Sequence, residues 1–137
     1  MKPYIWQVRV YYEDTDAGGV VYYASYLKFL ERARTEWLRS LGVEQDELVQ
    51  ARNILFAVRS VSIAYKQPAR FNDLLAITVE PHALRAASIS IRQRITHFHD
   101  EAVLLADAEI NVVCLQADSF TPLPIPNDLF KEIKSAC

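Results

Sequence analysis

One long amphipathic stretch, residues 24–41, most limits what this chain can fold into. Its apolar side chains recur at helical spacing and form one broad stripe, while most of its charged side chains fall on the other side. The stripe consists of Tyr26, Phe29, Leu30, Ala33, Trp37 and Leu41. Gly42 follows directly, where a left-handed residue often ends a helix. A stripe this wide predicts a long helix that is largely enclosed by a sheet.

The rest of the chain shows the alternation of β-strands. The side chains at even positions of residues 5–12 share one apolar face, which predicts a half-buried first strand. Four more strands are predicted after Asn53, and the connections between them are short enough for antiparallel neighbours. These strands cover residues 55–66, 73–84, 87–98 and 102–116.

Two shorter helices complete the predicted elements. Residues 44–51 are polar and predict either a second short helix or an irregular crossing. Three prolines end the last strand, and residues 127–134 predict a terminal helix with Asn127 as its cap. One strand, a long enclosed helix and four antiparallel strands are an α+β order, with a sheet of about five strands around the helix.

Length and charge narrow the class of protein. With 137 residues, half of them hydrophobic, the chain has material for one core, so a single domain spanning 1–137 is expected. The net charge of −2 gives no basic field for nucleic acid. The chain shows no secretory signal and no membrane-spanning run, and its two cysteines indicate no disulfide framework. These features predict a cytoplasmic protein.

An acidic turn stands between the first strand and the long helix. Residues 13–19 read EDTDAGG, which puts three carboxylates beside the amino end of a helix. That end has unpaired N–H groups and a partial positive charge, so it can hold a carboxylate ionised or receive an oxyanion. A capping or turn role for Asp14 or Asp16 is the alternative, because Asp is common in both positions.

The acidic turn carries a resemblance to a known family. Residues 8–27, VRVYYEDTDAGGVVYYASYL, and residues 31–36, ERARTE, resemble the signature of the hotdog-fold acyl-CoA thioesterases. The likeness is strongest to the YbgC type of the 4-hydroxybenzoyl-CoA thioesterase branch, which is associated with the Tol-Pal system. It extends more weakly to about residue 126. The resemblance implies the hotdog fold, in which an antiparallel sheet wraps a long central helix.

The resemblance also implies roles for residues of the turn. The second Asp of the family's Asp-x-Asp pair is catalytic, and here it is Asp16, as a general base on water or as the nucleophile. The backbone N–H of Tyr23, or another in the first helical turn, would stabilise the thioester oxyanion. Gly18, Gly19 and Val20 would lie along the acyl group. Most chains of the YbgC type have His at the position of Tyr23, so their substrate range is not carried over unchanged.

Substrate binding beyond the thioester is implied for a second segment. Family members bind pantetheine near residues 85–88, so Arg85 and Ser88 are candidate contacts, with an ordinary turn as the equal alternative. Four more basic residues are unranked candidates for the CoA phosphates, namely Lys66, Arg70, Arg92 and Arg94. Neither a cofactor nor a metal is expected, because CoA arrives as part of the substrate.

Other chemical candidates have simpler explanations. A second thioesterase branch carries its carboxylate on the central helix, but Glu31 and Glu36 have basic partners at helical spacing and are interpreted as structural. His97 and His99 have a spacing that metal sites sometimes use, yet no third ligand is evident, and both are interpreted as turn or surface residues.

The predicted activity is hydrolysis of short aliphatic or aromatic acyl-CoA to the free acid and CoA. Two alternatives remain: a non-catalytic scaffold that binds acyl carrier protein or other proteins of lipid metabolism, and, more weakly, a dehydratase of the same fold. An intact Asp16 motif favours the enzyme, and acyl carrier protein is a possible partner of it. Family members assemble as homodimers or homotetramers, and the open edges of a single sheet favour such pairing.

Overall fold

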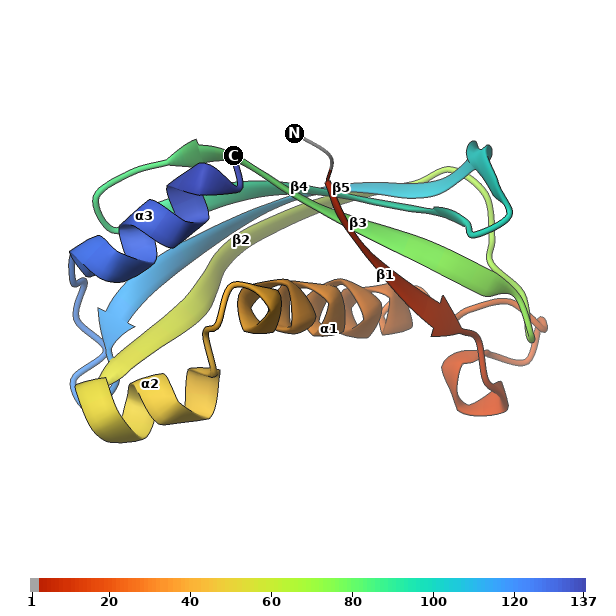
Figure 1. The fold of residues 1–137 in the computed structure, drawn as a ribbon. Helices are drawn as coiled ribbons and strands as arrows, with labels where there is room; N and C mark the ends of the chain where they lie inside the picture. Colours follow the sequence, from red (N-terminus) through yellow and green to blue (C-terminus); the bar gives the residue numbers. More distant parts are fainter. Residues whose placement is uncertain (1–2) are drawn as a thin grey trace.

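One antiparallel sheet curves over the long helix α1, as Figure 1 shows for the computed structural model of the protein, which describes residues 3–137. The sheet contains β1 (Tyr4–Arg9), β2 (Ile54–Tyr65), β3 (Leu74–Leu84), β4 (Ser88–His97) and β5 (Asp100–Gln116). Their order is β1-β3-β4-β5-β2, so β1 and β2 form the two edges. The helices are α1 (Ser25–Ser40), α2 (Gln45–Arg52) and α3 (Asn127–Ser135).

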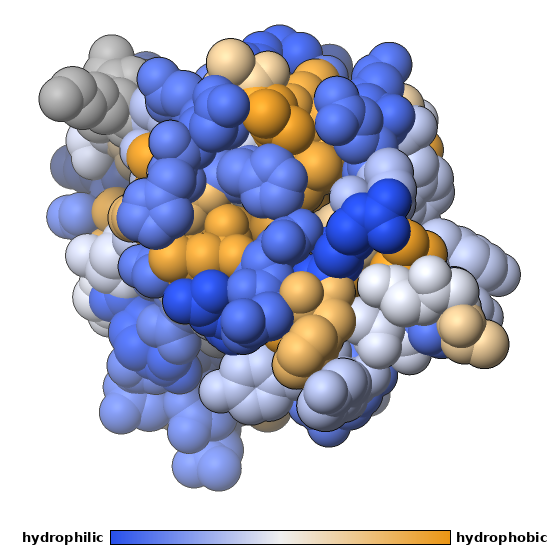
Figure 2. Space-filling view, turned by 90° about the vertical axis from the view of Figure 1, so that its right-hand side faces the viewer, coloured by the Kyte–Doolittle hydropathy of each residue, from blue (hydrophilic) through white to orange (hydrophobic). Residues whose placement is uncertain are grey.

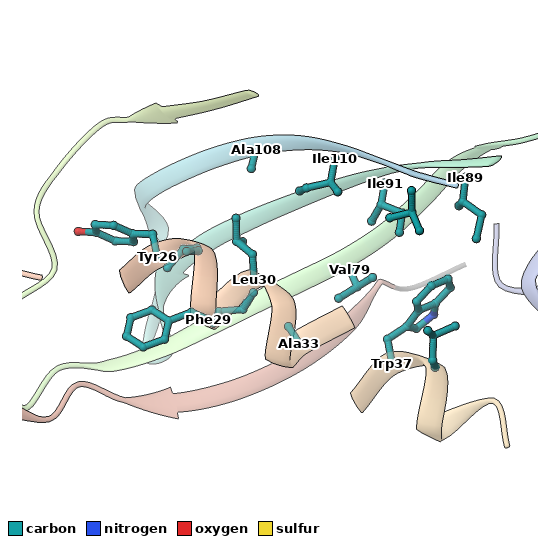
Figure 3. Close-up of a cluster of buried hydrophobic side chains, with 14 of the residues drawn as sticks. Tyr26, Phe29, Leu30, Ala33, Trp37, Val79, Ile89, Ile91, Ala108 and Ile110 are labelled. Atoms are coloured by element: carbon teal, nitrogen blue, oxygen red, sulfur yellow. The ribbon is translucent and has the colours of Figure 1, made fainter. Parts of the chain in front are cut away.

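The broad stripe of α1 is buried against the sheet, as its width predicts. Phe29 and Ala33 are fully buried, and Trp37 is 3% exposed. Figure 3 shows these side chains meeting inward-facing residues of three strands, among them Ile91 and Ile110. The sheet therefore wraps its central helix in the hotdog arrangement that the family resemblance implies.

A buried polar link holds α1 against the middle of the sheet. Gln93 of β4 is fully buried, and its Nε2 donates a hydrogen bond to the Leu30 carbonyl at 3.2 Å. Its Oε1 accepts a hydrogen bond from Arg34 Nη1 at 2.9 Å. Burial lowers the pKa of Arg34, and the charge of Glu31 opposes that shift. Because a buried amide is stable only when its bonds are made, the link sets the position of α1 along β4.

The element bounds agree closely with the periodicity, including a regular α2 where a helix or an irregular crossing was predicted. Gly42 has the left-handed backbone expected after α1, with φ of 83°. Two local predictions are wrong. The first strand ends at Arg9 and not at Tyr12, because the chain bends there into a 3₁₀ turn, Tyr12–Asp14. Asn127 is not the cap of α3: the capping residue is Pro126, and no side chain caps that end.

Candidate active site

Asp14 shapes the loop that leads from β1 to α1. Its side chain is 8% exposed, and Oδ2 accepts a hydrogen bond from the Tyr11 N–H at 2.8 Å. Its backbone carbonyl accepts a hydrogen bond from the Tyr22 N–H at 2.9 Å. One residue therefore ties the start of the acidic turn to the entrance of the helix. Asp14 has the turn role that was the alternative interpretation of this motif.

Asp16 differs from Asp14 because its side chain is exposed. Its Oδ1 accepts a hydrogen bond from the Gly18 N–H at 2.9 Å, and its carbonyl accepts one from the Gly19 N–H at 3.0 Å. Within residues 3–137 the carboxylate makes no other hydrogen bond. The second oxygen, Oδ2, is therefore available for a proton or a bond to substrate.

The two glycines serve the turn that presents Asp16. Gly19 has φ of 76°, a conformation that side chains rarely adopt. A Cβ at Gly18 would lie 3.2 Å from Asp16 Oδ1, closer than nearly all such contacts. Val20 closes the turn, since its carbonyl accepts a hydrogen bond from the Asp16 N–H at 2.9 Å. The geometry of the turn thus explains both glycines, whether or not they also contact an acyl group.

The entrance to α1 carries backbone N–H groups that make no hydrogen bond within residues 3–137. The Ser25 N–H donates to the Tyr22 carbonyl at 2.8 Å, and the Leu27 N–H donates to the Ala24 carbonyl at 3.2 Å. The N–H groups of Tyr23 and Ala24, in contrast, have no acceptor in the described part of the chain. Adjacent free N–H groups at a helix start are the arrangement that binds an anion or an oxyanion.

The acidic turn and the helix entrance lie within electrostatic reach of each other. The neighbouring Tyr23 phenol raises the pKa of Tyr22, and the charge of Asp16 adds to this rise. The rings of Tyr22 and Tyr23 are 4.8 Å apart, centre to centre. Thr15 and Val21 form an antiparallel bridge, so the backbone of the acidic turn lies beside the segment that leads to Tyr23 and Ala24.

A partly aromatic cleft of about 270 Å³ opens beside this segment. Tyr23, Tyr26 and Tyr65 line it, together with Val21 and the chain at residues 66–68. Figure 2 views the molecule from this end and shows apolar surface interrupted by polar groups. Such a mixture suits a ligand that has an apolar group and a polar reacting centre.

Arg85 and Ser88 do not join this site within one chain. Arg85 lies in the β3–β4 connection and Ser88 is the first residue of β4, where its carbonyl accepts a hydrogen bond from the Arg85 N–H at 2.9 Å. The acidic turn lies at the other end of β3, since the Val10 N–H donates to the Asp73 carbonyl beside Leu74. The eleven residues of β3 separate the two ends by roughly 35 Å.

The structure also ranks the basic residues that the sequence left unranked. Arg92 is engaged with Asp107, with an Nη2 to Oδ2 distance of 3.0 Å. Lys66 lines the aromatic cleft, and Arg70 forms an antiparallel bridge with Val20 of the turn. Of the four, Lys66 and Arg70 therefore lie beside the candidate site, whereas Arg92 and Arg94 line a different cavity.

The remaining candidates are Glu31, Glu36, His97 and His99, of which Glu36 has an ion-pair partner. Glu36 forms an ion pair with Arg39, as its helical spacing predicts. Glu31 lines a different small cavity with Arg34. His97 is the last residue of β4 and His99 lies in the turn that follows. In the described residues no group of three potential metal ligands comes together.

Comparisons with known proteins place this chain in one class. The profile of the thioesterase-like superfamily matches residues 10–133, which is most of the chain. A probable thioesterase from Bartonella henselae has a similar structure, with a TM-score of 0.84 and 32% identity. The match covers 91% of this chain and all of that one.

Two curated relatives define the family more narrowly. The acyl-CoA thioester hydrolase YbgC of Escherichia coli O157:H7 is 46% identical over 129 residues, 94% of each chain. The acyl-CoA thioesterase YbgC of Haemophilus influenzae is 41% identical, over 94% of this chain and 90% of that one. The chain belongs to the thioesterase-like superfamily and, within it, to the YbgC acyl-CoA thioesterases. It is therefore a thioester hydrolase.

Proposed function

We propose that the acidic turn and the entrance of α1 form the active site that hydrolyses the acyl-CoA thioester. The observation that carries the proposal is the pair of unbonded N–H groups, of Tyr23 and Ala24, in the segment next to Asp16. Hydrolysis needs an oxygen nucleophile and a site for the oxyanion, and this segment offers a group for each.

The reaction can be written with these groups alone. Asp16 Oδ2 takes a proton from a water molecule while the oxygen of that water adds to the thioester carbonyl carbon. The Tyr23 N–H holds the oxyanion that forms. The carbon–sulfur bond then breaks, the free acid is released, and the CoA thiolate takes up a proton. In the second route Asp16 attacks the carbon itself, and water later cleaves the resulting anhydride. Water supplies the oxygen in both routes, so the reaction requires no cofactor.

The two routes place the oxygen of water differently. Single-turnover hydrolysis in water enriched in ¹⁸O, with enzyme in excess, separates them. Direct attack by water leaves the label in the acid alone. In the anhydride route water can attack either carbonyl, and attack at the aspartyl carbon leaves the label in Asp16, where mass spectrometry of the peptide detects it.

The aromatic cleft favours short or flat acyl groups. Its volume of about 270 Å³ fits a short aliphatic chain or one aromatic ring, and three tyrosines line it. Lys66 and Arg70 are the proposed partners of the CoA phosphates, because both lie beside this region. Arg85 and Ser88 can serve the same substrate only from a second chain, since β3 separates them from Asp16.

Thiol release from a panel of acyl-CoAs tests the proposed function. Acetyl-, butyryl-, hexanoyl-, benzoyl- and palmitoyl-CoA span the relevant range of size and shape. We expect the highest kcat/KM among the short and aromatic members and the lowest for palmitoyl-CoA. Absence of hydrolysis across the whole panel would favour the alternative of a non-catalytic partner of acyl carrier protein or lipid metabolism, which binding to acylated carrier protein would then show.

Tyr23→Phe is expected to change kcat by only a few-fold. The substitution keeps the backbone N–H of residue 23, which is the proposed oxyanion donor, and removes only the phenol oxygen. Tyr23→His, which introduces the residue usual in YbgC chains, is expected to remain active with an altered order of preference among acyl groups. Steady-state kinetics on the same panel measure both. A loss of a hundredfold in Tyr23→Phe, at an unchanged melting temperature, would give the phenol a chemical role.

A homodimer completes the proposal. β2 is an edge strand, and it carries exposed apolar side chains at Val58, Val61 and Tyr65. An uncovered edge with such side chains is a surface that pairing protects from solvent. Sedimentation equilibrium is expected to give twice the 15.7 kDa of one chain, or four times that mass if dimers pair. A monomer at micromolar concentration would contradict the assembly.

We also place the enzyme in the cytoplasm. Cys114 and Cys137 are both free thiols, as a reducing compartment allows. No helix in residues 3–137 has the length and hydropathy to cross a bilayer.

A further inference from the structure

Tyr65 connects the end of β2 to the entrance of α1. Its hydroxyl donates a hydrogen bond to the Tyr23 carbonyl at 3.1 Å, across 42 positions of the chain. No sequence pattern indicates this contact, because Tyr65 lies in an ordinary strand pattern. It is a side chain from another element that contacts the backbone of the two free donors.

The bonded carbonyl belongs to the same peptide group as a free donor. The Tyr23 carbonyl and the Ala24 N–H share one planar unit, so a bond to the oxygen fixes the direction of the N–H. A hydrogen bond to the oxygen also polarises the unit and makes the N–H a stronger donor. The Ala24 N–H has no acceptor within the described chain, so it remains available to a ligand.

The Tyr65 ring is itself held in place. It lies against the ring of Tyr26, with centres 5.3 Å apart and planes tilted by 60°. Tyr26 is 3% exposed, and its hydroxyl oxygen accepts a hydrogen bond from the Ala69 N–H at 3.0 Å. The Ala69 carbonyl accepts a hydrogen bond from the Val21 N–H at 2.8 Å. These contacts link both sides of the loop at residues 21–24 to fixed parts of the fold.

We propose that Tyr65 is a positioning residue whose hydroxyl orients the Tyr23–Ala24 peptide, so that the Ala24 N–H acts as a second oxyanion donor beside the Tyr23 N–H. This rests on the proposed function of the Asp16 site and adds a residue and a donor to it. Tyr65 acts through the backbone and neither transfers a proton nor touches the reacting carbon. Two donors hold a developing negative charge better than one, and the gain appears in the transition state.

The protonation of Tyr65 suits this role. Burial raises its pKa, and the neighbouring phenols of Tyr26 and Tyr23 raise it further. Because an unperturbed phenol is already protonated at neutral pH, the raised pKa keeps the hydrogen on Tyr65 through the working range. The bond to the Tyr23 carbonyl is therefore present throughout, and Tyr65 adds no limb to the pH profile near neutrality.

Tyr65→Phe tests the proposal, because it removes the hydroxyl and keeps the ring. We expect kcat to fall by about tenfold, the factor that one hydrogen bond contributes, while KM stays within about twofold. Tyr12→Phe is the matched control. It removes a tyrosine hydroxyl that is exposed and makes no hydrogen bond within residues 3–137, so its kcat should equal that of wild type.

Amide NMR gives a readout that does not depend on turnover. In ¹⁵N-labelled protein the Ala24 amide resonance is expected to move in Tyr65→Phe and to stay in place in Tyr12→Phe. An unmoved Ala24 amide, or a change in KM alone, would overturn the positioning role. So would a kcat within twofold of wild type in Tyr65→Phe while Asp16→Asn is inactive, and that result would leave the proposed active site standing. An active Asp16→Asn would instead overturn the proposed active site.

Discussion

Asp16→Asn is expected to lower kcat for thioester hydrolysis by about a hundred- to ten-thousandfold. That range is the usual contribution of a positioned general base, and an amide can neither take the proton from water nor attack the carbonyl. The fold should be unaffected. The Asn Oδ1 can still accept the hydrogen bond from the Gly18 N–H, so the turn keeps its shape. Thiol release at saturating substrate, together with circular dichroism and the melting temperature, measures both parts of this prediction.

Asp14→Asn provides the matched control, two positions away in the same turn. Asp14 is buried and bonded to the Tyr11 N–H, so its change should affect stability more than turnover. The Asn oxygen can still accept this bond but without the negative charge that strengthens it, which costs about 1 kcal/mol. If Asp14→Asn abolished hydrolysis at an unchanged melting temperature while Asp16→Asn remained active, Asp14 would be the catalytic carboxylate and Asp16 the turn residue.

Much of the fold was predictable because it depends on local periodicity. In α1 and in the strands, apolar residues recur at fixed intervals and so lie on one face of each element. Packing that face against another element removes the apolar side chains from water. The end of β1 was not predictable in this way. Alternation continues to Tyr12, but the Asp14 carboxylate accepts a hydrogen bond from the Tyr11 N–H, and the chain bends there. A bond from a side chain to the backbone leaves no trace in the hydrophobic periodicity.

The candidate site likewise contains residues that a local motif predicts and residues that only the structure brings in. Asp16 and Tyr23 belong to one short motif, so their proximity follows from the local turn. Tyr65 reaches the site through a contact across 42 positions, which no local pattern reports. Arg85 and Ser88 were inferred from the family, and the structure places them at the opposite end of β3 from the turn. A family resemblance can combine residues of two chains in one site, whereas one chain shows only its own share.

The structure gives Gly18 and Gly19 a different role from the one that the sequence predicts. Gly18 and Gly19 were expected to admit an acyl group. In the structure Gly19 has a positive φ, and Gly18 stands next to Asp16 Oδ1. Both features serve the turn that presents the carboxylate. The two positions are the same in both explanations, but only the backbone geometry says what a side chain there would meet.

Trp37→Ala is expected to lower the free energy of unfolding by about 3–5 kcal/mol, the usual cost of truncating a buried aromatic side chain. Trp37 is 3% exposed and lies in the last turns of α1, where Figure 3 shows it pointing toward Val79, Ile89 and Ile91. Urea unfolding followed by circular dichroism measures the change. Leu27→Ala is the control on the same helix, because Leu27 is 41% exposed and should cost far less.

The same substitution separates stability from chemistry. Trp37 lies 14 positions after Tyr23, which is roughly 20 Å along a helix, so the oxyanion donors at the entrance are outside its reach. The folded fraction of Trp37→Ala should therefore keep nearly the wild-type kcat at low temperature. If Trp37→Ala unfolded at the same urea concentration as wild type, the enclosure of α1 by the sheet would be contradicted. A stable protein with a lost kcat would mean that the far end of α1 controls the position of its entrance, which the Gln93 link to Leu30 is expected to prevent.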